Sequence, residues 1–366
     1  MEYQEPKFFQ VMKYAEAASG DVIDMVSGNP DWSPPAGVVA GLREYADSDP
    51  EGFQYPPSDG LLALRQEIAD RRNVSVDRVI ITHGAGEANY LAMAAALEHT
   101  VGSEILLLDP VYPYYVGKAN MLGADPRLVP THPNGDPDID AIRSAAGDET
   151  AAIIINTPNN PTGAVYDAET IRAVAAIAAE SDAMLISDEV YDHFDHSAQF
   201  TSALSLEFDR KIVTNSFSKS MAITGFRVGY GIFPPEVGDA ARARHMLVTV
   251  AGSRPAQYAV LTGLRRTGPD YYRVNRERLQ SRIETFTDRL ETIGATYTHP
   301  DGGFYVMATF PDAPGSMDTV RTLIDECGVA GMPGDTFGSA RSDWLRFALV
   351  TPRVQAAADR LVDHFG

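Results

Sequence analysis

Residues 183–191 read AMLISDEVY and residues 211–219 read KIVTNSFSK, two apolar runs that each end in charged or polar residues. Four further apolar runs lie at residues 79–82, 104–108, 152–155 and 227–233. Nearly continuous runs without period-two alternation are typical of strands buried on both faces of a mainly parallel sheet. Helix-like segments, such as residues 87–98 and 168–180, separate the runs. The alternation predicts an α/β sheet layered by helices.

The sequence after this region predicts a second, smaller unit. Residues 270–293 form a long helical pattern rich in Arg and Glu, and strand-like pieces at 303–309 and 344–348 then mix with helices. This mixture predicts a smaller α+β domain. The N-terminal residues, rich in Pro and Gly between 28 and 37, are too few for a domain, so we expect them to pack against another part of the chain.

The charge of the chain excludes several classes of partner. Its 366 residues include 30 Lys and Arg against 50 Asp and Glu, a formal net charge of −20. This negative charge disfavours nucleic acid and anionic membranes as partners. Only five of the basic residues are Lys. An acidic, Lys-poor chain is typical of an organism that lives at high salt, although an excess of charge also serves solubility in general.

The composition also indicates where the protein works. A single cysteine, Cys327, excludes an intrachain disulfide framework and a cysteine-built metal cluster. The start, MEYQEPKFFQ, lacks the basic and apolar regions of a signal peptide, and no stretch approaches the roughly 18 apolar residues of a membrane span. We therefore expect a cytoplasmic protein. The metal-like patterns at residues 136–140 and 193–196 lack further ligands, so no metal is expected.

Polar and aromatic clusters follow five of the predicted strands. They lie at residues 83–87, 109–115, 156–163, 188–191 and 216–219. Ligands of parallel sheets bind beyond the carboxyl ends of the strands. We therefore expect the five clusters to form one composite site.

The first of these clusters has the pattern of an anion-binding turn. Small residues between a strand and a helix, as in Gly84-Ala85-Gly86, leave backbone N–H groups at the helix N-terminus free to hold a phosphate. A dinucleotide fingerprint would need Gly at position 89, which is Asn, and no Walker A sequence follows. A tight strand–helix turn without a ligand is the alternative interpretation.

The last two clusters carry a lysine and a carboxylate at strand ends. A desolvated lysine at position 219 would lose its proton readily and could form a Schiff base, although a solvated lysine at a strand end is the alternative. Arg227, eight residues on, is a cation suited to a phosphate. Asp188 emerges from a buried strand, where a carboxylate needs a cation or hydrogen bonds, and a pyridinium nitrogen is one such partner.

In combination these features resemble the class I/II aminotransferases, pyridoxal-phosphate enzymes of the aspartate aminotransferase fold. The resemblance covers nearly the whole chain and rests on nine motifs in the family's order. They are GNPDW at 28–32, Tyr55 with GLLALR at 60–65, GAGEA at 84–88, PVY at 110–112, NPTG at 160–163, DEVY at 188–191, SFSK at 216–219 with Arg227, PG at 333–334 with FG at 337–338, and WLRFA at 344–348.

The resemblance implies a role for each residue of the site. Lys219 would be the Schiff-base lysine and proton shuttle, and Asp188 would pair with the pyridine nitrogen. Asn160 and Tyr191 would bond the ring oxygen, and Tyr112 would stack on the ring. The phosphate would be held by Ala85, Gly86, Ser216 and Arg227, with Tyr55 added from the neighbouring subunit. The substrate would be bound by Arg346 at its α-carboxylate, with Gly28 and Asn160 beside it.

The resemblance also implies the architecture and the reaction. A large pyridoxal-phosphate-binding domain would span residues 38–260 around a mainly parallel seven-stranded sheet sandwiched by helices. Residues 1–37 and 261–366 would form the small α+β domain. The protein would be a homodimer with shared active sites that moves an amino group from an L-amino acid to a 2-oxo acid in ping-pong order.

The substrate and two other functions stay open at this point. In an aspartate-specific branch of the family a phosphate-loop lysine grips the distal carboxylate, and the matching position here is Gly86. Arg254 lies where the partner subunit contributes to the site and could replace that cation, or be an ordinary surface residue. The donor could be aspartate, an aromatic or a neutral amino acid, with 2-oxoglutarate as acceptor. A lyase, racemase or decarboxylase would share Lys219 and Asp188, and a non-catalytic pyridoxal-phosphate-binding regulator is a remote alternative.

Overall fold

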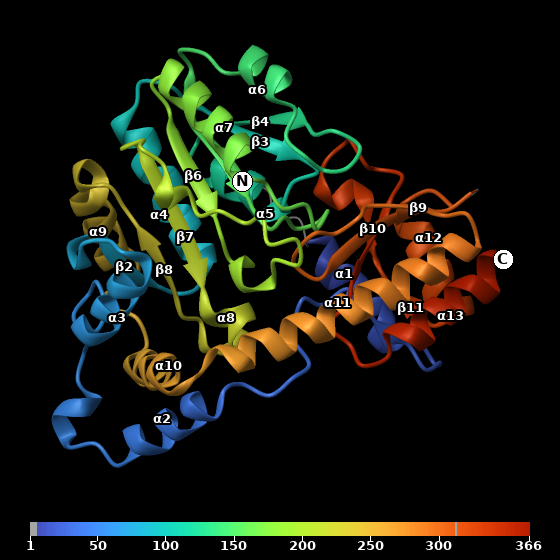
Figure 1. Ribbon diagram of the computed structural model, residues 1–366, viewed down its shortest axis with the longest axis horizontal. Coiled ribbons are helices and arrows are strands. Elements are labelled where there is room, and N and C mark those ends of the chain that lie inside the picture. The colour runs from blue at the N-terminus through green and yellow to red at the C-terminus, as the bar shows by residue number, and fades with distance from the viewer. Residues whose placement is uncertain (1–5, 312) are drawn as a thin grey trace.

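The computed structural model describes residues 6–311 and 313–366, and Figure 1 shows the chain coloured from the N-terminus to the C-terminus. Residues 1–5 lie outside the described residues. They are the first residues of the expected small domain and of the stretch MEYQEPKFFQ, which lacks the regions of a signal peptide. In chain order the α-helices are α1 (Lys7–Ala17), α2 (Ala36–Ala46), α3 (Leu62–Arg72), α4 (Ala85–His99), α5 (Pro113–Met121), α6 (Ile139–Ala145), α7 (Ala168–Glu180), α8 (Phe217–Ser220), α9 (Pro235–Thr249), α10 (Arg254–Arg266), α11 (Pro269–Thr292), α12 (Met317–Thr322) and α13 (Val354–Phe365). The strands are β1 (Ile23–Asp24), β2 (Val79–Thr82), β3 (Glu104–Asp109), β4 (Asp125–Pro130), β5 (Thr150–Asn156), β6 (Met184–Asp188), β7 (Lys211–Ser216), β8 (Gly229–Ile232), β9 (Thr296–Tyr297), β10 (Tyr305–Thr309), β11 (Val329–Ala330), β12 (Met332–Pro333) and β13 (Leu345–Ala348).

The larger sheet has seven strands in the order β2-β8-β7-β6-β5-β3-β4. Strands β3 to β7 pair in parallel, whereas β8 is antiparallel to both of its neighbours. The predicted mainly parallel seven-stranded sheet is therefore confirmed. Because β8 alone runs backwards, the amino end of β8 lies at the same edge as the carboxyl ends of the other strands.

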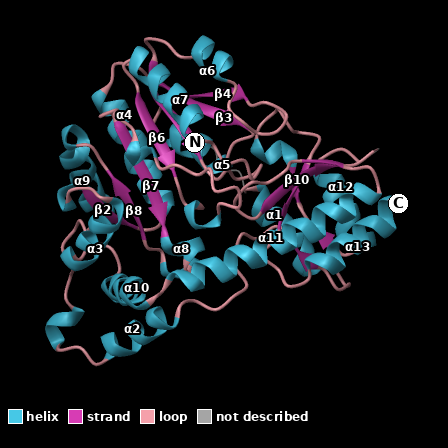
Figure 2. Cartoon of the chain, in the orientation of Figure 1, coloured by secondary structure: helices cyan, strands magenta, loops and turns pink. Residues whose placement is uncertain are grey.

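Helices cover both faces of this sheet, as Figure 2 shows. On one face Ile153 and Ile155 of β5 pack in a core with residues of α3, α7 and α10. On the other face Ile154 packs with residues of α4, α5 and α9. Successive strand residues point to opposite faces, so a strand that is covered on both sides is apolar at every position. This is why β5 and β6 read as continuous apolar runs.

A second core lies around the four-stranded sheet β12-β13-β10-β9. Residues of α1, α12, α13 and the second half of α11 pack there. Strand β1 pairs in parallel with β11, so the N-terminal segment contacts this C-terminal part of the chain. In Figure 1 the long helix α11, in orange, runs from the larger sheet to the second core.

In the larger sheet, β4 and β8 are among the strands that differ from the sequence prediction. The edge strand β4 was not predicted, because its residues are mostly exposed or half-buried and form no apolar run. Strand β8 begins at Gly229 rather than at residue 227, since Arg227 has a left-handed backbone with φ of 55°. In the described part of the chain, no helix is long and apolar enough to cross a membrane.

Candidate active site

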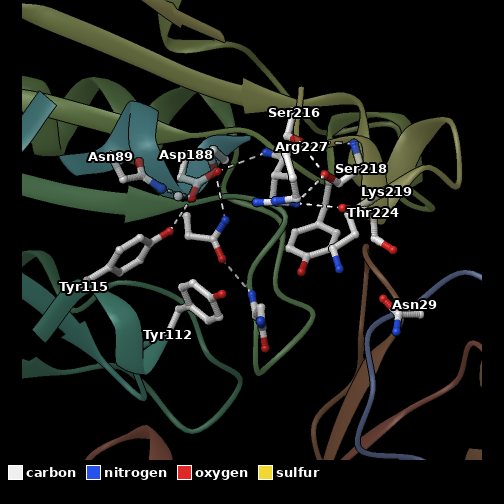
Figure 3. A pocket seen from close by; sticks show the side chains of 16 residues that line it. Asn29, Asn89, Tyr112, Tyr115, Asp188, Ser216, Ser218, Lys219, Thr224 and Arg227 are labelled. Atoms are coloured by element: carbon white, nitrogen blue, oxygen red, sulfur yellow. Dashed lines mark hydrogen bonds between the residues drawn. The ribbon is translucent and has the colours of Figure 1, made fainter. Parts of the chain in front are cut away.

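Two cavities lie at the carboxyl ends of the parallel strands and meet at Lys219. Their volumes are about 280 Å³ and about 630 Å³. Lys219, Tyr112, Asn160 and Tyr191 line both of them. All five strand-end clusters predicted from the sequence contribute residues to the smaller cavity, which Figure 3 shows from close by. The separate clusters thus form a single composite site.

Lys219 lies in the one-turn helix α8, directly after β7. Its Nζ donates a hydrogen bond of 2.6 Å to the carbonyl oxygen of Gly28. Burial, with the nearby charges of Arg346 and Arg227, lowers the pKa of Lys219 to about 8. A neutral amine is therefore available near neutral pH, which a solvated lysine would not provide.

Asp188 ends β6 and is buried beneath the smaller cavity. Its Oδ2 accepts hydrogen bonds from Asn89 Nδ2 at 2.7 Å and from Tyr115 Oη at 2.6 Å, and its Oδ1 accepts one from the Val190 amide. Figure 3 shows Asn89 and Tyr115 pointing at this carboxylate. Burial raises the pKa of Asp188, and the hydrogen bonds oppose that rise. No salt bridge to Asp188 occurs within residues 6–311 and 313–366, so its hydrogen-bond partners are uncharged.

One end of the smaller cavity has the features of an anion site. Gly84, with φ of 76°, caps α4, whose first N–H groups have no acceptor within the helix. Arg227 Nη2 donates a hydrogen bond to the carbonyl oxygen of His83, and Ser218 Oγ lies 3.5 Å from Arg227 Nη1. A Cβ at Gly84 would lie 2.7 Å from Arg227 Nη2, so only glycine allows this approach. The Ser216 hydroxyl accepts the Ser218 N–H and also lines the cavity.

Arg346 lies in β13 and is buried where the second core meets the larger sheet. Its Nη1 donates to Asn160 Oδ1 at 3.1 Å and its Nη2 to the Val26 carbonyl at 2.6 Å. The guanidinium stacks on the rings of Tyr305 and Phe337, at 4.4 and 5.0 Å from their centroids. Its buried Nε has no hydrogen-bond partner among the described residues. Arg346 also lines the larger cavity.

The larger cavity combines aromatic walls with one ion pair. Lys7, the first residue of α1, forms a 2.5 Å salt bridge with Asp335, and both side chains are partly exposed. The aromatic and apolar residues that line this cavity include Phe8, Tyr112, Tyr114, Tyr191, Tyr305, Met332 and Phe337. Gly28 lines it too, and a Cβ there would lie 2.2 Å from Tyr305 Oη.

Two residues singled out from the sequence do not line either cavity of their own chain. Tyr55 is 83% exposed. Arg254 Nη1 donates hydrogen bonds to the carbonyl oxygens of Glu51 and Gln54, and so holds the loop that precedes Tyr55. A role for either residue in a neighbouring subunit stays a prediction.

Sequence reasoning missed several residues of the site. Asn89 is a fully buried amide in the otherwise apolar centre of α4, and such a residue in a helix of Ala and Leu was a usable signal. Tyr115 lies in the cluster at residues 109–115, but the sequence does not indicate which tyrosine of that cluster points at Asp188. Tyr305 sits in a short apolar strand and carries no local signal of its position beside Arg346.

Comparison with known proteins places the chain among close structural relatives. Residues 20–365 match the family described as aminotransferase class I and II. The chain is 31% identical to the aspartate aminotransferase of Thermotoga maritima, over 94% of this chain and 91% of that protein. It is 29% identical to the aromatic-amino-acid aminotransferase 2 of Thermococcus litoralis, over 96% and 94%. A solved structure of aspartate aminotransferase from Thermus thermophilus with maleate superposes with a TM-score of 0.89 at 28% identity, over 98% and 97% of the two chains.

Proposed function

We propose a substrate class for this chain. The chain belongs to the class I and II aminotransferases. It is therefore a pyridoxal-phosphate-dependent enzyme that moves amino groups from amino acids to 2-oxo acids. The proposed donor is an L-amino acid with an aromatic or other large apolar side chain. The proposed acceptor is a 2-oxo acid with a second carboxylate, such as 2-oxoglutarate. The observation that supports both is the larger cavity, which has aromatic walls and, apart from Lys219, the two cations Lys7 and Arg346.

The smaller cavity fits pyridoxal phosphate by its donors and acceptors. Asp188 is a buried carboxylate held only by neutral donors, so a protonated pyridine nitrogen would supply the missing cation. The N-terminus of α4 and Arg227 suit a phosphate, and a Cβ at Gly86 would meet nothing within 4 Å. Lys219 lines the same cavity. We propose that Ala85, Gly86, Ser216 and Arg227 bind the phosphate group, Asp188 the ring nitrogen, Asn160 and Tyr191 the ring oxygen, and Tyr112 the ring face.

Bound pyridoxal phosphate supplies an electron sink that makes the substrate Cα–H bond acidic. In the proposed mechanism, Lys219 would hold the cofactor, and its Nζ as a neutral amine would take the Cα proton as general base. The lowered pKa of Lys219, about 8, keeps enough neutral amine for this step. Asp188 keeps the ring nitrogen protonated, since its own hydrogen bonds hold the carboxylate in place.

Arg346 is the proposed anchor for the α-carboxylate of both substrates. The orphan Nε gives the guanidinium a free donor beside the larger cavity, and Asn160 fixes the orientation of its other side. Arginine binds a carboxylate in a two-pronged geometry that lysine cannot reproduce. Stacking between Tyr305 and Phe337 keeps water from the buried guanidinium and strengthens its attraction for the substrate.

Lys7 is the proposed cation for the distal carboxylate of the acceptor. The residue at position 86, a lysine in one aspartate-specific branch, is Gly here, and Arg254 bonds backbone carbonyls of its own chain. Lys7 lines the larger cavity, and within residues 6–311 and 313–366 its one salt bridge is the partly exposed pair with Asp335, which is worth at most about 1 kcal/mol. A dicarboxylate could therefore replace Asp335 as partner of Lys7, while an aromatic donor would leave the pair intact.

The test is a half-reaction screen of the twenty amino acids and of 2-oxoglutarate, read from the cofactor absorbance, in the wild type and in Lys7→Met. We expect phenylalanine or tyrosine to react in the wild type. Lys7→Met should lower kcat/KM for 2-oxoglutarate by about ten- to a hundredfold, as expected for a lost charge-assisted hydrogen bond, and leave phenylalanine unchanged. Lys13→Met, which removes an exposed lysine from the same helix, is the control. Equal losses for both substrates would contradict the role of Lys7, and a screen without any aromatic donor would contradict the substrate class.

We also propose a homodimer with shared active sites. Large apolar side chains are exposed on two segments that lie close together, since Arg254 bonds Glu51 and Gln54. These side chains are Phe53, Tyr55, Leu62, Met246, Leu247, Val248 and Val250. A surface of this kind is typical of a subunit interface. Within the dimer, Tyr55 would reach the phosphate of the neighbouring subunit.

The remaining proposals concern the domains and the setting of the enzyme. We propose a large domain of residues 38–260 and a small domain of residues 1–37 and 261–366, which the two separate cores support. A cytoplasmic, high-salt setting is supported by the net charge of −20 and by one buried, unpaired cysteine. Its test is a thermal unfolding series in KCl, in which the unfolding midpoint should rise with salt.

A further inference from the structure

The turn between β2 and α4 is braced by a carboxylate that two histidines share. Glu87 Oε2 accepts the His83 backbone N–H at 2.6 Å and lies 2.9 Å from His83 Nδ1. The other oxygen, Oε1, lies 2.8 Å from His245 Nδ1, which belongs to α9. These residues, the His83–Glu87–His245 cluster, join the anion-binding turn to a helix that is distant in sequence.

The geometry assigns protons within the cluster. Both histidines face the carboxylate with Nδ1, so each ring must carry a proton there to make its hydrogen bond. His245 is fully buried, and its Nε2 has no hydrogen-bond partner among the described residues, so the protein provides no acceptor for a second proton on that ring. His83 is partly exposed, so its second nitrogen can take up a proton at lower cost. His83 is thus the member of the cluster that can become a cation.

The cluster lies at the proposed phosphate site. The carbonyl oxygen of His83 accepts a hydrogen bond from Arg227 Nη2 at 3.2 Å, and Glu87 lies in the first turn of α4. Without a neighbouring cation, the Glu87 charge would repel a phosphate bound at that helix end. Protonation of His83 would cancel this charge, because the pair Glu87–His83 is then neutral overall.

We propose that His83 is a positioning residue of the phosphate site. His83 holds the anion-binding turn through Glu87. When His83 is protonated, it neutralises Glu87 and so strengthens binding of the cofactor's phosphate group. This inference rests on the proposed function, because it takes the turn to be the phosphate site. Loss of the His83 proton leaves one net negative charge beside the phosphate, so affinity for the cofactor falls as pH rises.

The charged groups around His83 determine the pH at which the affinity for the cofactor falls. The hydrogen bond with Glu87 of α4 raises the pKa of His83 above its usual 6.5, while Arg227, before β8, opposes the rise. His245 of α9 faces His83 with ring centroids 6.2 Å apart. Burial alone would raise the pKa of Glu87, but hydrogen bonds from His245 and His83 lower it to about 2, so Glu87 stays charged over the working range. The transition therefore belongs to His83.

The experiment measures binding of pyridoxamine phosphate and of pyridoxamine to the cofactor-free protein by equilibrium dialysis between pH 6 and 9. Pyridoxamine phosphate forms no covalent bond with Lys219, and the titration of that lysine is common to the wild type and the variants, so it cancels when they are compared at the same pH. Pyridoxamine lacks the phosphate and reports the rest of the site. The variants are His83→Asn, which keeps a donor toward Glu87 but no titrating charge, and Glu87→Gln. His99→Asn, an exposed histidine at the other end of α4, is the control.

The wild type should bind pyridoxamine phosphate about tenfold more tightly than His83→Asn at pH 6, and the two affinities should become equal by pH 9. The comparison at each pH cancels the titration of the phosphate itself. Glu87→Gln should move the transition to lower pH, His99→Asn should match the wild type, and pyridoxamine should bind all variants alike. Equal profiles for the wild type and His83→Asn, or a loss that pyridoxamine shares, would overturn this inference alone. A wild type that binds neither ligand would overturn the proposed function and the inference with it.

Discussion

Replacing Gly28 by Ala tests how closely the second core approaches Lys219. The added Cβ would lie 2.2 Å from Tyr305 Oη and 3.3 Å from both Tyr305 Cζ and Lys219 Nζ. Ordinary contacts of a Cβ begin at 3.4 Å, so Tyr305 Oη must move by 3.4 − 2.2 = 1.2 Å. Tyr305 cannot yield easily, because its ring is 3% exposed, packs at 4.4 Å from the Arg346 guanidinium and lies edge-on to Tyr191.

The size of the effect follows from this displacement. Overpacking a buried site costs about 1–3 kcal/mol of stability. A shift of about 1 Å in a group that positions a substrate can lower the rate about a hundredfold. We therefore expect Gly28→Ala to lower kcat/KM of the half-reaction by about a hundredfold, since the shift of Tyr305 is passed on to Arg346.

The assay is a double-mutant cycle with Tyr305→Phe, which removes the oxygen that the new Cβ meets first. The double variant should recover at least tenfold of the lost kcat/KM, and the unfolding midpoint should recover in parallel. Gly20→Ala is the matched control, because a Cβ there meets nothing within 4 Å. Wild-type kinetics in Gly28→Ala, or additive effects of the two substitutions, would refute the reasoning.

Three further predictions concern the lysine, the carboxylate and the subunit interface. Because burial and two nearby arginines lower the pKa of Lys219 to about 8, its labelling by an amine-reactive reagent in the cofactor-free protein should rise about tenfold per pH unit below pH 8 and level off above it. A rise that continues toward pH 10, measured by mass spectrometry of the labelled peptide, would show an ordinary solvated lysine. Asp188→Asn should lower kcat by about a hundredfold or more, because the buried charge is lost. The unfolding midpoint should not fall, because burial raises the pKa of Asp188 and so disfavours its charged form. An unchanged kcat would count against the role of Asp188 at the ring nitrogen. Leu247→Glu, at a side chain that is 81% exposed, should convert a dimer into monomers in sedimentation velocity at micromolar concentration, and an unaltered sedimentation coefficient would place the interface elsewhere.

Much of the larger sheet could be predicted because its strands are covered on both faces. Burial on both sides makes β5 and β6 apolar over most of their length, so the local sequence identifies them. Lys219 and Asp188 could be predicted for a related reason. Each directly follows or ends such a strand, and in a parallel sheet the carboxyl ends meet at one edge. Strand β4 escaped detection because it lies at an edge of the sheet, where burial imposes no continuous apolar pattern.

The sequence by itself thus determined the mainly parallel sheet, the edge of the sheet at which the two cavities lie and the residues at the strand ends. Tertiary structure alone decided the contacts between residues far apart in the chain. Asn89 and Tyr115 meet at Asp188 because α4 and α5 pack on the same face of the sheet. Lys7 and Asp335 pair because the N-terminal segment joins the second core. These contacts depend on how whole helices and sheets pack, and the local pattern of a strand or turn carries no information about that packing.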